Sequence, residues 1–197
     1  MTVQAPDPVA TALFLVLAMS AAGGVHVLWL KSAAARRLTQ PVDASLTLRG
    51  RRVFGDNKML RGFVAMPIAG AAIFALLGAS RAAAPTWLAS GMWSMSAAEY
   101  AVLGFVCGLA FMAAELPNSF LKRQLDIAPG MPAAHPVLRT FFFVVDRLDS
   151  VLGVLIAASL LVPVQAATWL WVLALGPGVH AIFSVILHRV GIKARAL

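Results

Sequence analysis

The sequence predicts an all-α integral membrane protein with about five transmembrane helices and a polar site on the cytoplasmic side. Three observations support this. The 197-residue chain is 60% hydrophobic and only 12% charged, with a mean hydropathy of +0.85, whereas a soluble domain is about 25% charged. Its apolar runs approach the roughly 20 residues that cross a ~30 Å hydrocarbon core. The charged residues are concentrated in a few segments between these runs.

Five apolar segments are long enough to be transmembrane helices, and they cover residues 9–30, 63–82, 97–114, 138–162 and 167–187. No long polar stretch separates them, so we expect a single membrane domain over residues 1–197. Its polar cytoplasmic segments are residues 31–62 and 115–137. Cys107 is the only cysteine, which excludes an internal disulfide or a cysteine-based metal site.

The charge distribution predicts the orientation of the chain in the membrane. Residues 31–62 contain eight Lys and Arg against two Asp, and residues 115–137 and the C-terminal tail add further basic residues. The positive-inside rule therefore puts both segments and the C-terminus in the cytoplasm, with the N-terminus outside a multi-pass plasma (inner) membrane protein. Basic loops also attract anionic lipid, so the net charge of +8 does not indicate a nucleic-acid partner.

The fourth apolar segment, which includes "FFFVVDRLDSVLGVLIAASLLVP", carries Asp146, Arg147 and Asp149. A charged side chain at the centre of a membrane helix costs about 2.5–3.5 kcal/mol, so these residues should face the bundle interior or a wet cavity. Asp146 and Asp149 are spaced i, i+3 and share one helix face. A rise of about 1.5 Å per residue places them in the cytoplasmic third of the bilayer.

Three interpretations of this aspartate pair fit the residues alone. Two carboxylates that face one cavity repel each other unless a cation lies between them, and Mg²⁺ often binds one or two carboxylates plus substrate phosphates. Asp146 and Asp149 would then be metal ligands for phosphate chemistry. The pair could instead form the proton or ion path of a small transporter. It could also be a structural network in which Arg147 bridges both acids.

A second polar patch, "ELPNSFLKRQLD", covers residues 115–126. Glu115, Ser119 and Lys122 follow one helical stripe, and Asp126 continues it. Pro117 is expected to break or kink the third span at the cytoplasmic boundary. A surface helix that lies in the lipid headgroups is the alternative interpretation of this patch.

A third patch, "RRVFGDNKMLRGF", covers residues 51–63. Gly55, Asp56 and Asn57 predict a turn, and Lys58 and Arg61 follow at the start of the second span. A helix start that lies beside glycine and basic side chains is a favourable place to bind phosphate.

Taken together, "GDNKMLRGF" (55–63), "NSFLKRQLD" (118–126) and "DRLDS" (146–150) resemble, in this order, the motifs of the CDP-archaeol synthase family. This family is grouped with the phosphatidate cytidylyltransferases. The resemblance implies a reaction in which a lipid phosphate attacks the α-phosphorus of CTP in the presence of Mg²⁺, giving a CDP-lipid and pyrophosphate. The lipid would be phosphatidate-like or an ether/isoprenoid glycerol phosphate.

The resemblance also implies roles for individual residues. Asp146 and Asp149 would bind Mg²⁺ and act in catalysis together with Lys122 and Asp126. The expected substrate-binding residues are Asn57, Lys58, Arg61, Ser119, Arg123 and Arg147. The expected partners are CTP, the membrane lipid phosphate and the bilayer.

A small ion- or proton-coupled membrane transporter is the alternative function. A transporter needs polar residues on both sides of the membrane, but the segments predicted to lie in its outer half have almost no charge. Small residues within the spans permit close helix packing, either within one chain or in a homo-oligomer. These residues include Ala10, Ala21, Gly23, Gly70 and Gly104.

Overall fold

Five long helices form the molecule in the computed structural model, which describes residues 4–189. They are α1 (Pro8–Leu30), α2 (Leu60–Ala79), α4 (Ala97–Gln124), α5 (Pro136–Leu161) and α6 (Ala166–Arg189). By length and composition α1, α2 and α4 can each cross a membrane, while α6 has an apolar stretch over Ala166–Val179. The five helices coincide with the five predicted segments, and the all-α membrane fold is confirmed.

The connections contain short elements, namely η1 (Ala35–Arg37), η2 (Arg81–Ala83) and α3 (Thr86–Ala89). The first connection also contains a small antiparallel hairpin of β1 (Thr47–Leu48) and β2 (Arg51–Arg52). Its two turn residues, Arg49 and Gly50, both have positive φ, as in the tight turns that suit the twist of a hairpin. The hairpin is not evident from the sequence, because Arg-Gly is a weaker hairpin signal than Asn-Gly or Asp-Gly.

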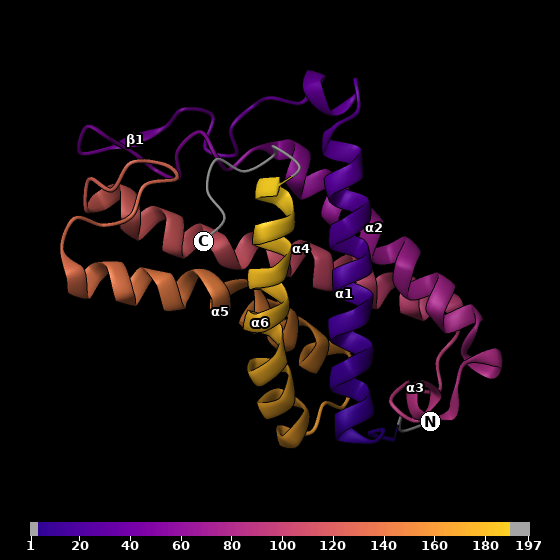
Figure 1. Ribbon diagram of the computed structural model, residues 1–197. Helices are drawn as coiled ribbons and strands as arrows, with labels where there is room; N and C mark the ends of the chain where they lie inside the picture. The colour runs from indigo at the N-terminus through magenta and orange to yellow at the C-terminus, as the bar shows by residue number, and fades with distance from the viewer. Residues whose placement is uncertain (1–3, 190–197) are drawn as a thin grey trace.

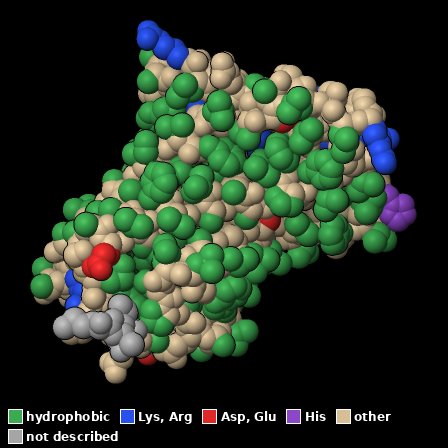
Figure 2. All heavy atoms as spheres, turned by 180° about the vertical axis from the view of Figure 1, so that it is seen from behind, with side chains coloured by type: hydrophobic (Ala, Val, Ile, Leu, Met, Phe, Trp, Pro, Cys, Tyr) green, Lys and Arg blue, Asp and Glu red, His purple; other side chains and the backbone are tan. Residues whose placement is uncertain are grey.

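The helices are arranged around α4, which packs against α2 on one side and α5 on the other. Helices α1 and α6 lie side by side and run in the same direction, and α2 crosses them obliquely (Figure 1). The start of α1 lies at one end of the molecule, and the β1–β2 hairpin lies at the other (Figure 1). Hydrophobic side chains cover most of the face shown in Figure 2, and Lys and Arg side chains lie mainly at its margins.

Helix α4 is longer than the predicted third span, residues 97–114. It continues as one helix through Pro117 to Gln124. Of the predicted break or kink at Pro117, the break is therefore wrong. The first ten residues of the expected polar segment 115–137 are therefore helical. Proline removes one backbone hydrogen bond from a helix. Here the helix is stabilised at both ends, by a capping box at Ser96 and by basic residues in its last turn.

Glycines allow the helices around α4 to approach very closely. A Cβ atom on Gly70 of α2 would lie 2.3 Å from the carbonyl oxygen of Gly104, and a Cβ on Gly153 of α5 would lie 2.6 Å from the carbonyl oxygen of Ala110. Neither contact leaves room for a side chain. Gly70 and Gly104 thus pack within one chain, and Gly153 brings the neighbouring turn of α5, which contains Asp149, against α4.

An aromatic cluster forms the core at the end of the molecule away from the hairpin. The ring of Phe14 lies 5.4 Å from that of Phe74, 6.2 Å from Trp93 and 5.8 Å from Tyr100, each in an edge-to-face arrangement. All four side chains are fully buried. This cluster joins α1, α2, the segment before α4 and the first turn of α4.

Candidate active site

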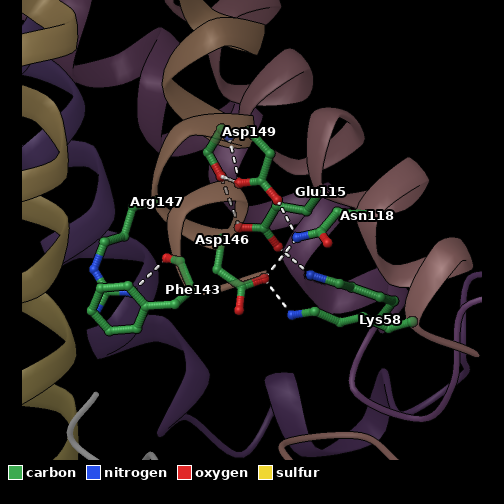
Figure 3. A network of polar contacts seen from close by, with 9 residues as sticks. Lys58, Glu115, Asn118, Phe143, Asp146, Arg147 and Asp149 are labelled. Carbon is green, nitrogen blue, oxygen red and sulfur yellow. Dashed lines mark hydrogen bonds and ion pairs between the residues drawn. The ribbon is translucent and has the colours of Figure 1, made fainter. Parts of the chain in front are cut away.

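Three separate segments bring polar side chains together near the hairpin end of the bundle. Lys58 comes from the end of the first connection. Glu115, Asn118 and Lys122 project from successive turns of α4, and the facing turns of α5 contribute two aspartates, Asp146 and Asp149 (Figure 3). The site therefore depends on the close packing of α4 and α5.

The two aspartates of α5 face the same side chain of α4. The amide nitrogen Nδ2 of Asn118 donates to Oδ1 of Asp146 at 2.7 Å and to Oδ2 of Asp149 at 2.9 Å. Because one nitrogen atom reaches both carboxylates, they share one helix face, as their spacing predicts. Asn118 is 6% exposed and Asp149 is half-buried, while the side chain of Asp146 is 45% exposed. Asp146 thus forms the open side of the pair.

Two lysines lie beside these acids. Lys122 forms an ion pair with Asp146, and Lys58 forms one with Glu115. The hydroxyl of Ser150 lies 3.0 Å from Glu115 Oε1 and 3.2 Å from Asp149 Oδ1, within donating distance of either. Contacts therefore continue from Lys58 through Glu115 and Ser150 to Asp149.

Arg123 lies at the border between α4 and the loop that follows the hairpin. It is 9% exposed, and its Nε and Nη1 atoms are buried without a hydrogen-bond partner in the described part of the chain. A Cβ on Gly55 would lie 3.3 Å from Arg123 Nη1, so glycine lets the loop backbone contact the guanidinium group. A buried cation without a paired acceptor is costly. Arg123 is therefore suited to bind an anion such as phosphate.

Asp43 holds this loop in shape. It is buried, and it accepts hydrogen bonds from Arg52 Nη2 at 2.8 Å and from the backbone N–H groups of Phe54 at 2.9 Å and Gly55 at 3.1 Å. Burial alone would raise the pKa of Asp43, but these hydrogen bonds outweigh it and hold the pKa well below its ordinary value. An ionised Asp43 thus fixes the Gly55 turn beside Arg123.

The other predicted substrate-binding residues near the hairpin take less part in contacts. Asn57 is exposed, and its Nδ2 atom would lie 3.8 Å from a Cβ placed on Gly130 in the loop before α5. Arg61 and Ser119 are half-buried, and their side chains make no hydrogen bond or ion pair within residues 4–189.

The structure places Asp126 and Arg147 outside the polar cluster. Asp126 follows the end of α4 with a φ of +57° and pairs with Arg51, so it leaves the stripe on which Glu115 and Lys122 lie. The guanidinium group of Arg147 lies 3.4 Å from the ring centre of Phe143 and donates to the Phe143 carbonyl oxygen (Figure 3). The structural interpretation in which Arg147 bridges Asp146 and Asp149 is therefore wrong.

Asn118 and Ser150 belong to the site but are not among the predicted site residues. Glu115 lies on the predicted stripe of α4, although the motifs assign it no role in the site. Asn118 belongs to the same helix face, because it lies three residues after Glu115 and four before Lys122. This spacing is the sequence signal that could identify Asn118.

Within the described residues, no group of three or more His, Cys, Asp or Glu side chains is arranged to hold a metal ion. The cluster does offer two carboxylates on one face, together with a buried amide oxygen, Oδ1 of Asn118, that has no hydrogen-bond partner among residues 4–189. This set fits Mg²⁺, which takes oxygen ligands and typically uses one or two carboxylates plus substrate phosphates and water.

Comparison with known proteins agrees with the resemblance drawn from the three motifs. The family model described as CarS-like, CDP-archaeol synthase, matches residues 31–196. A CDP-archaeol synthase from Thermofilum pendens is 29% identical over 194 residues, which cover 98% of this chain and 83% of the relative. A CDP-archaeol synthase from Halobacterium salinarum is 31% identical over 160 residues, which cover 78% of this chain and 81% of the relative.

A solved structure described as an intramembrane enzyme for archaeal membrane lipids biosynthesis has the same fold. Its TM-score is 0.59 at 26% identity, and the match covers 88% of this chain and 92% of that chain. None of these comparisons supports the transporter alternative. The family model covers well over half of the sequence, and the chain therefore belongs to the CDP-archaeol synthase family.

Proposed function

We propose that this protein transfers the cytidylyl group of CTP to a lipid phosphate in the cytoplasmic leaflet, giving a CDP-lipid and pyrophosphate. The observation that supports the proposal is a cluster of acids and lysines in a member of this family. Asp146 and Asp149 face the same side chain, Lys122 pairs with Asp146, and Lys58 pairs with the neighbouring Glu115. The lipid is phosphatidate-like or an ether/isoprenoid glycerol phosphate.

The chemistry requires neutralisation of charge more than a protein nucleophile. An oxygen of the lipid phosphate forms a bond to the α-phosphorus of CTP. The bond from that phosphorus to the bridging oxygen breaks, and pyrophosphate leaves with the electron pair. Both reactants are anionic, so positioned cations that align them and offset the developing charge supply most of the catalysis.

The lysines and Arg123 are the residues that we assign to the phosphates. Lys122 lies beside Asp146 at the open side of the pair, where it can contact the reacting phosphate. Lys58 follows the Gly55 turn, and Arg123 presents unpartnered N–H groups to the same loop. The loop and the end of α4 thus supply cations to one triphosphate, and Asn57, Arg61 and Ser119 complete the pocket around it.

We assign Asp146 and Asp149 as the residues that hold Mg²⁺. When bound, the ion supplies positive charge to the phosphate oxygens. We assign no catalytic step to Asp126 or Arg147, because their side chains are paired with Arg51 and stacked on Phe143.

The location of the site suits one water-soluble and one membrane-held substrate. Asp146 is open, and exposed apolar side chains of the same turns of α5, Phe141, Phe143 and Val144, can contact acyl chains. We place the hairpin end and the C-terminus in the cytoplasm, and the N-terminus outside. The basic first connection supports this orientation. It also agrees with the structure, in which α1 begins at the end of the molecule opposite the hairpin.

The test is an assay of the purified protein with labelled CTP and Mg²⁺ against phosphatidate, an ether-linked isoprenoid glycerol phosphate and a polyprenyl phosphate. We expect a CDP-lipid and pyrophosphate in equal amounts with one of the first two substrates. If neither product forms with any lipid of the panel, the proposal fails. Asp149→Asn is the matched negative control, because it removes one carboxylate charge and keeps the size of the side chain.

A further inference from the structure

Asn118 puts a single amide nitrogen between the two aspartates of the site. A side-chain amide has two N–H donors and one acceptor oxygen. Both donors are used here, one on Asp146 at 2.7 Å and one on Asp149 at 2.9 Å. The nitrogen therefore lies in the space that both carboxylates face (Figure 3).

The other end of this amide is unsatisfied. Oδ1 of Asn118 is buried and has no hydrogen-bond partner within the described residues. The remaining buried and unpartnered side-chain polar atoms in that part of the chain are all nitrogens, and they belong to His26, Arg81, Arg123 and Gln124. Buried polar groups are almost always hydrogen-bonded. In this structure the oxygen points away from the two carboxylates. If it turned toward them, it would become an acceptor that an oxygen-binding cation could satisfy.

The nearest acidic side chain is already occupied. Glu115 pairs through Oε2 with Lys58, and its Oε1 lies 3.0 Å from the hydroxyl of Ser150. A cation held by Asp146 and Asp149 would have to break these contacts to gain Glu115, whereas Asn118 already lies between the two aspartates.

A half-turn of the amide about its terminal torsion exchanges the nitrogen for the oxygen without any movement of α4, since this torsion has broad, roughly two-fold preferences. With nitrogen inward, the amide holds the two carboxylates together by hydrogen bonds. With oxygen inward, it faces a cation. We propose that Asn118 is the third protein oxygen ligand of the divalent-cation site formed by Asp146 and Asp149, and that its amide turns over when the cation binds. This inference depends on the metal site of the proposed function.

A neutral third ligand also fits the substrates. Two carboxylates balance the charge of one divalent ion, so an amide adds a ligand without adding a negative charge that would repel the phosphates of CTP. Glu115 would add such a charge, and its ion pair with Lys58 keeps it neutralised.

The experiment measures the binding of Mn²⁺ alone to the full-length protein by electron paramagnetic resonance, without CTP. Asn118→Leu keeps the approximate size of the side chain but removes both the ligand oxygen and the N–H donors. If Asn118 is a ligand, we expect Mn²⁺ to bind on the order of tenfold more weakly. If Asn118 is only a donor that competes with the cation, the freed carboxylates should bind Mn²⁺ as tightly as before or more tightly, and that result would overturn the proposal.

Asn57→Leu is the matched control, because Asn57 and Asn118 are the only asparagines in the chain. We expect this control to leave the affinity for Mn²⁺ unchanged, since the side chain of Asn57 is exposed near the 128–131 loop. The Asn57→Leu protein also permits a second measurement that leaves Asn118 intact. With asparagine labelled by ¹³C at Cγ, electron–nuclear double resonance of bound Mn²⁺ should show a ¹³C coupling from Asn118. If the coupling is absent, Asn118 is not a ligand.

Asp146→Asn and Asp149→Asn separate failure of this inference from failure of the proposed function. If both variants keep the affinity for Mn²⁺, the proposed metal site is wrong and the role of Asn118 falls with it. If both variants lose Mn²⁺ while Asn118→Leu retains it, the metal site stands and only the role of Asn118 is rejected.

Discussion

The two ends of the bundle differ in whether their buried polar atoms have hydrogen-bond partners. At the end where α1 begins, Phe14, Phe74, Trp93 and Tyr100 are fully buried, and their polar atoms are satisfied: Tyr100 donates to the Trp93 carbonyl at 2.8 Å and Trp93 to the Pro163 carbonyl at 3.0 Å. At the hairpin end, Arg123 and Asn118 are almost as deeply buried, but they retain polar atoms that have no partner in the part of the chain that the structure describes.

Stability and activity therefore reside at different ends of the molecule. Closely packed aromatic side chains with satisfied polar groups stabilise a fold, whereas buried donors and acceptors without partners destabilise it unless a ligand pairs with them. We therefore expect changes at the aromatic end to alter unfolding and changes at the polar end to alter turnover. The predictions below test that separation.

The largest effect is expected from Phe14→Ala. Phe14 contacts three aromatic rings from three different segments, and truncation of a buried phenylalanine destabilises a protein by about 3–5 kcal/mol. Thermal unfolding in detergent should show a large drop in the midpoint. The fraction that remains folded should turn over substrate at the wild-type rate. A low rate per folded molecule would show that the two ends are coupled.

Asp149→Asn should have the opposite effect. Removal of a positioned charge that stabilises a transition state lowers the turnover rate on the order of 10²–10³-fold, while the amide keeps the size of the side chain. We expect the thermal midpoint to be unchanged or slightly raised, because Asp149 is a half-buried charge close to Glu115 and Asp146. If the thermal midpoint falls in parallel with the turnover rate, Asp149 is a structural residue.

Arg123→Gln tests the unpartnered guanidinium group. If Arg123 binds a phosphate of CTP, loss of a charge-assisted hydrogen bond worth about 1.5–3 kcal/mol should raise the KM for CTP at least tenfold. Stability should not fall, since the change removes buried donors that have no acceptor among the described residues. Arg51→Gln is the matched control, because the side-chain contacts of Arg51 within residues 4–189 are exposed ones with Asp126 and the Gln124 carbonyl. An equal change in KM for both variants would indicate a general effect of positive charge.

Most of the fold could be predicted from the sequence, because apolar runs of bilayer length leave few alternatives. The aspartate pair could be predicted in the same way, since the cost of charge in a membrane forces Asp146 and Asp149 toward the interior and their spacing puts them on one face. The end of α4 could not be predicted. Local preference favours a break at Pro117, whereas the packing of α4 between α2 and α5 adds to its stabilised ends and holds the segment as one helix.

The remaining parts of the site depend on contacts between segments far apart in the sequence. Asn118 is uncharged and carries no composition signal. Its role is visible only once Gly153 has brought α5 against α4. Asp126 was predicted to continue the stripe of Glu115, but the helix ends before it, and the positive φ at Asp126 turns the chain toward Arg51. Periodicity predicts helix faces well and fails where the helix stops.

Asp43→Asn should destabilise the loop moderately, by about 1–2 kcal/mol, because backbone donors at Phe54 and Gly55 and the side chain of Arg52 lose a charged acceptor. The folded-state pKa of Asp43 lies below its ordinary value near 4. Its contribution to stability is therefore fully present above about pH 4 and is lost as the pH falls below that value toward the folded-state pKa.

The measurement for Asp43 is the difference in thermal midpoint between wild type and Asp43→Asn across the pH range. It should be constant from pH 6 to pH 8 and should shrink below about pH 4. Asp56→Asn is the control, since Asp56 is exposed and its side chain pairs only with Arg52 in the described structure. A difference that changes near neutral pH would contradict the role given to Asp43.

The smallest effect is expected from Arg147→Gln. Its guanidinium group is stacked on Phe143 and bonded to a backbone carbonyl of its own helix, on the side of α5 away from Asn118. An exposed cation–π contact of this kind contributes about 0.5–1 kcal/mol to folding stability. Because the Arg147 side chain contacts Phe143 and none of the residues assigned to the substrates in the described structure, kcat/KM for CTP should change less than threefold. Arg147 follows Asp146 directly in the sequence, and adjacent residues on a helix point in different directions. A loss of tenfold or more in kcat/KM would show that Arg147 leaves Phe143 to contact the substrates, and that the polar end rearranges when they bind.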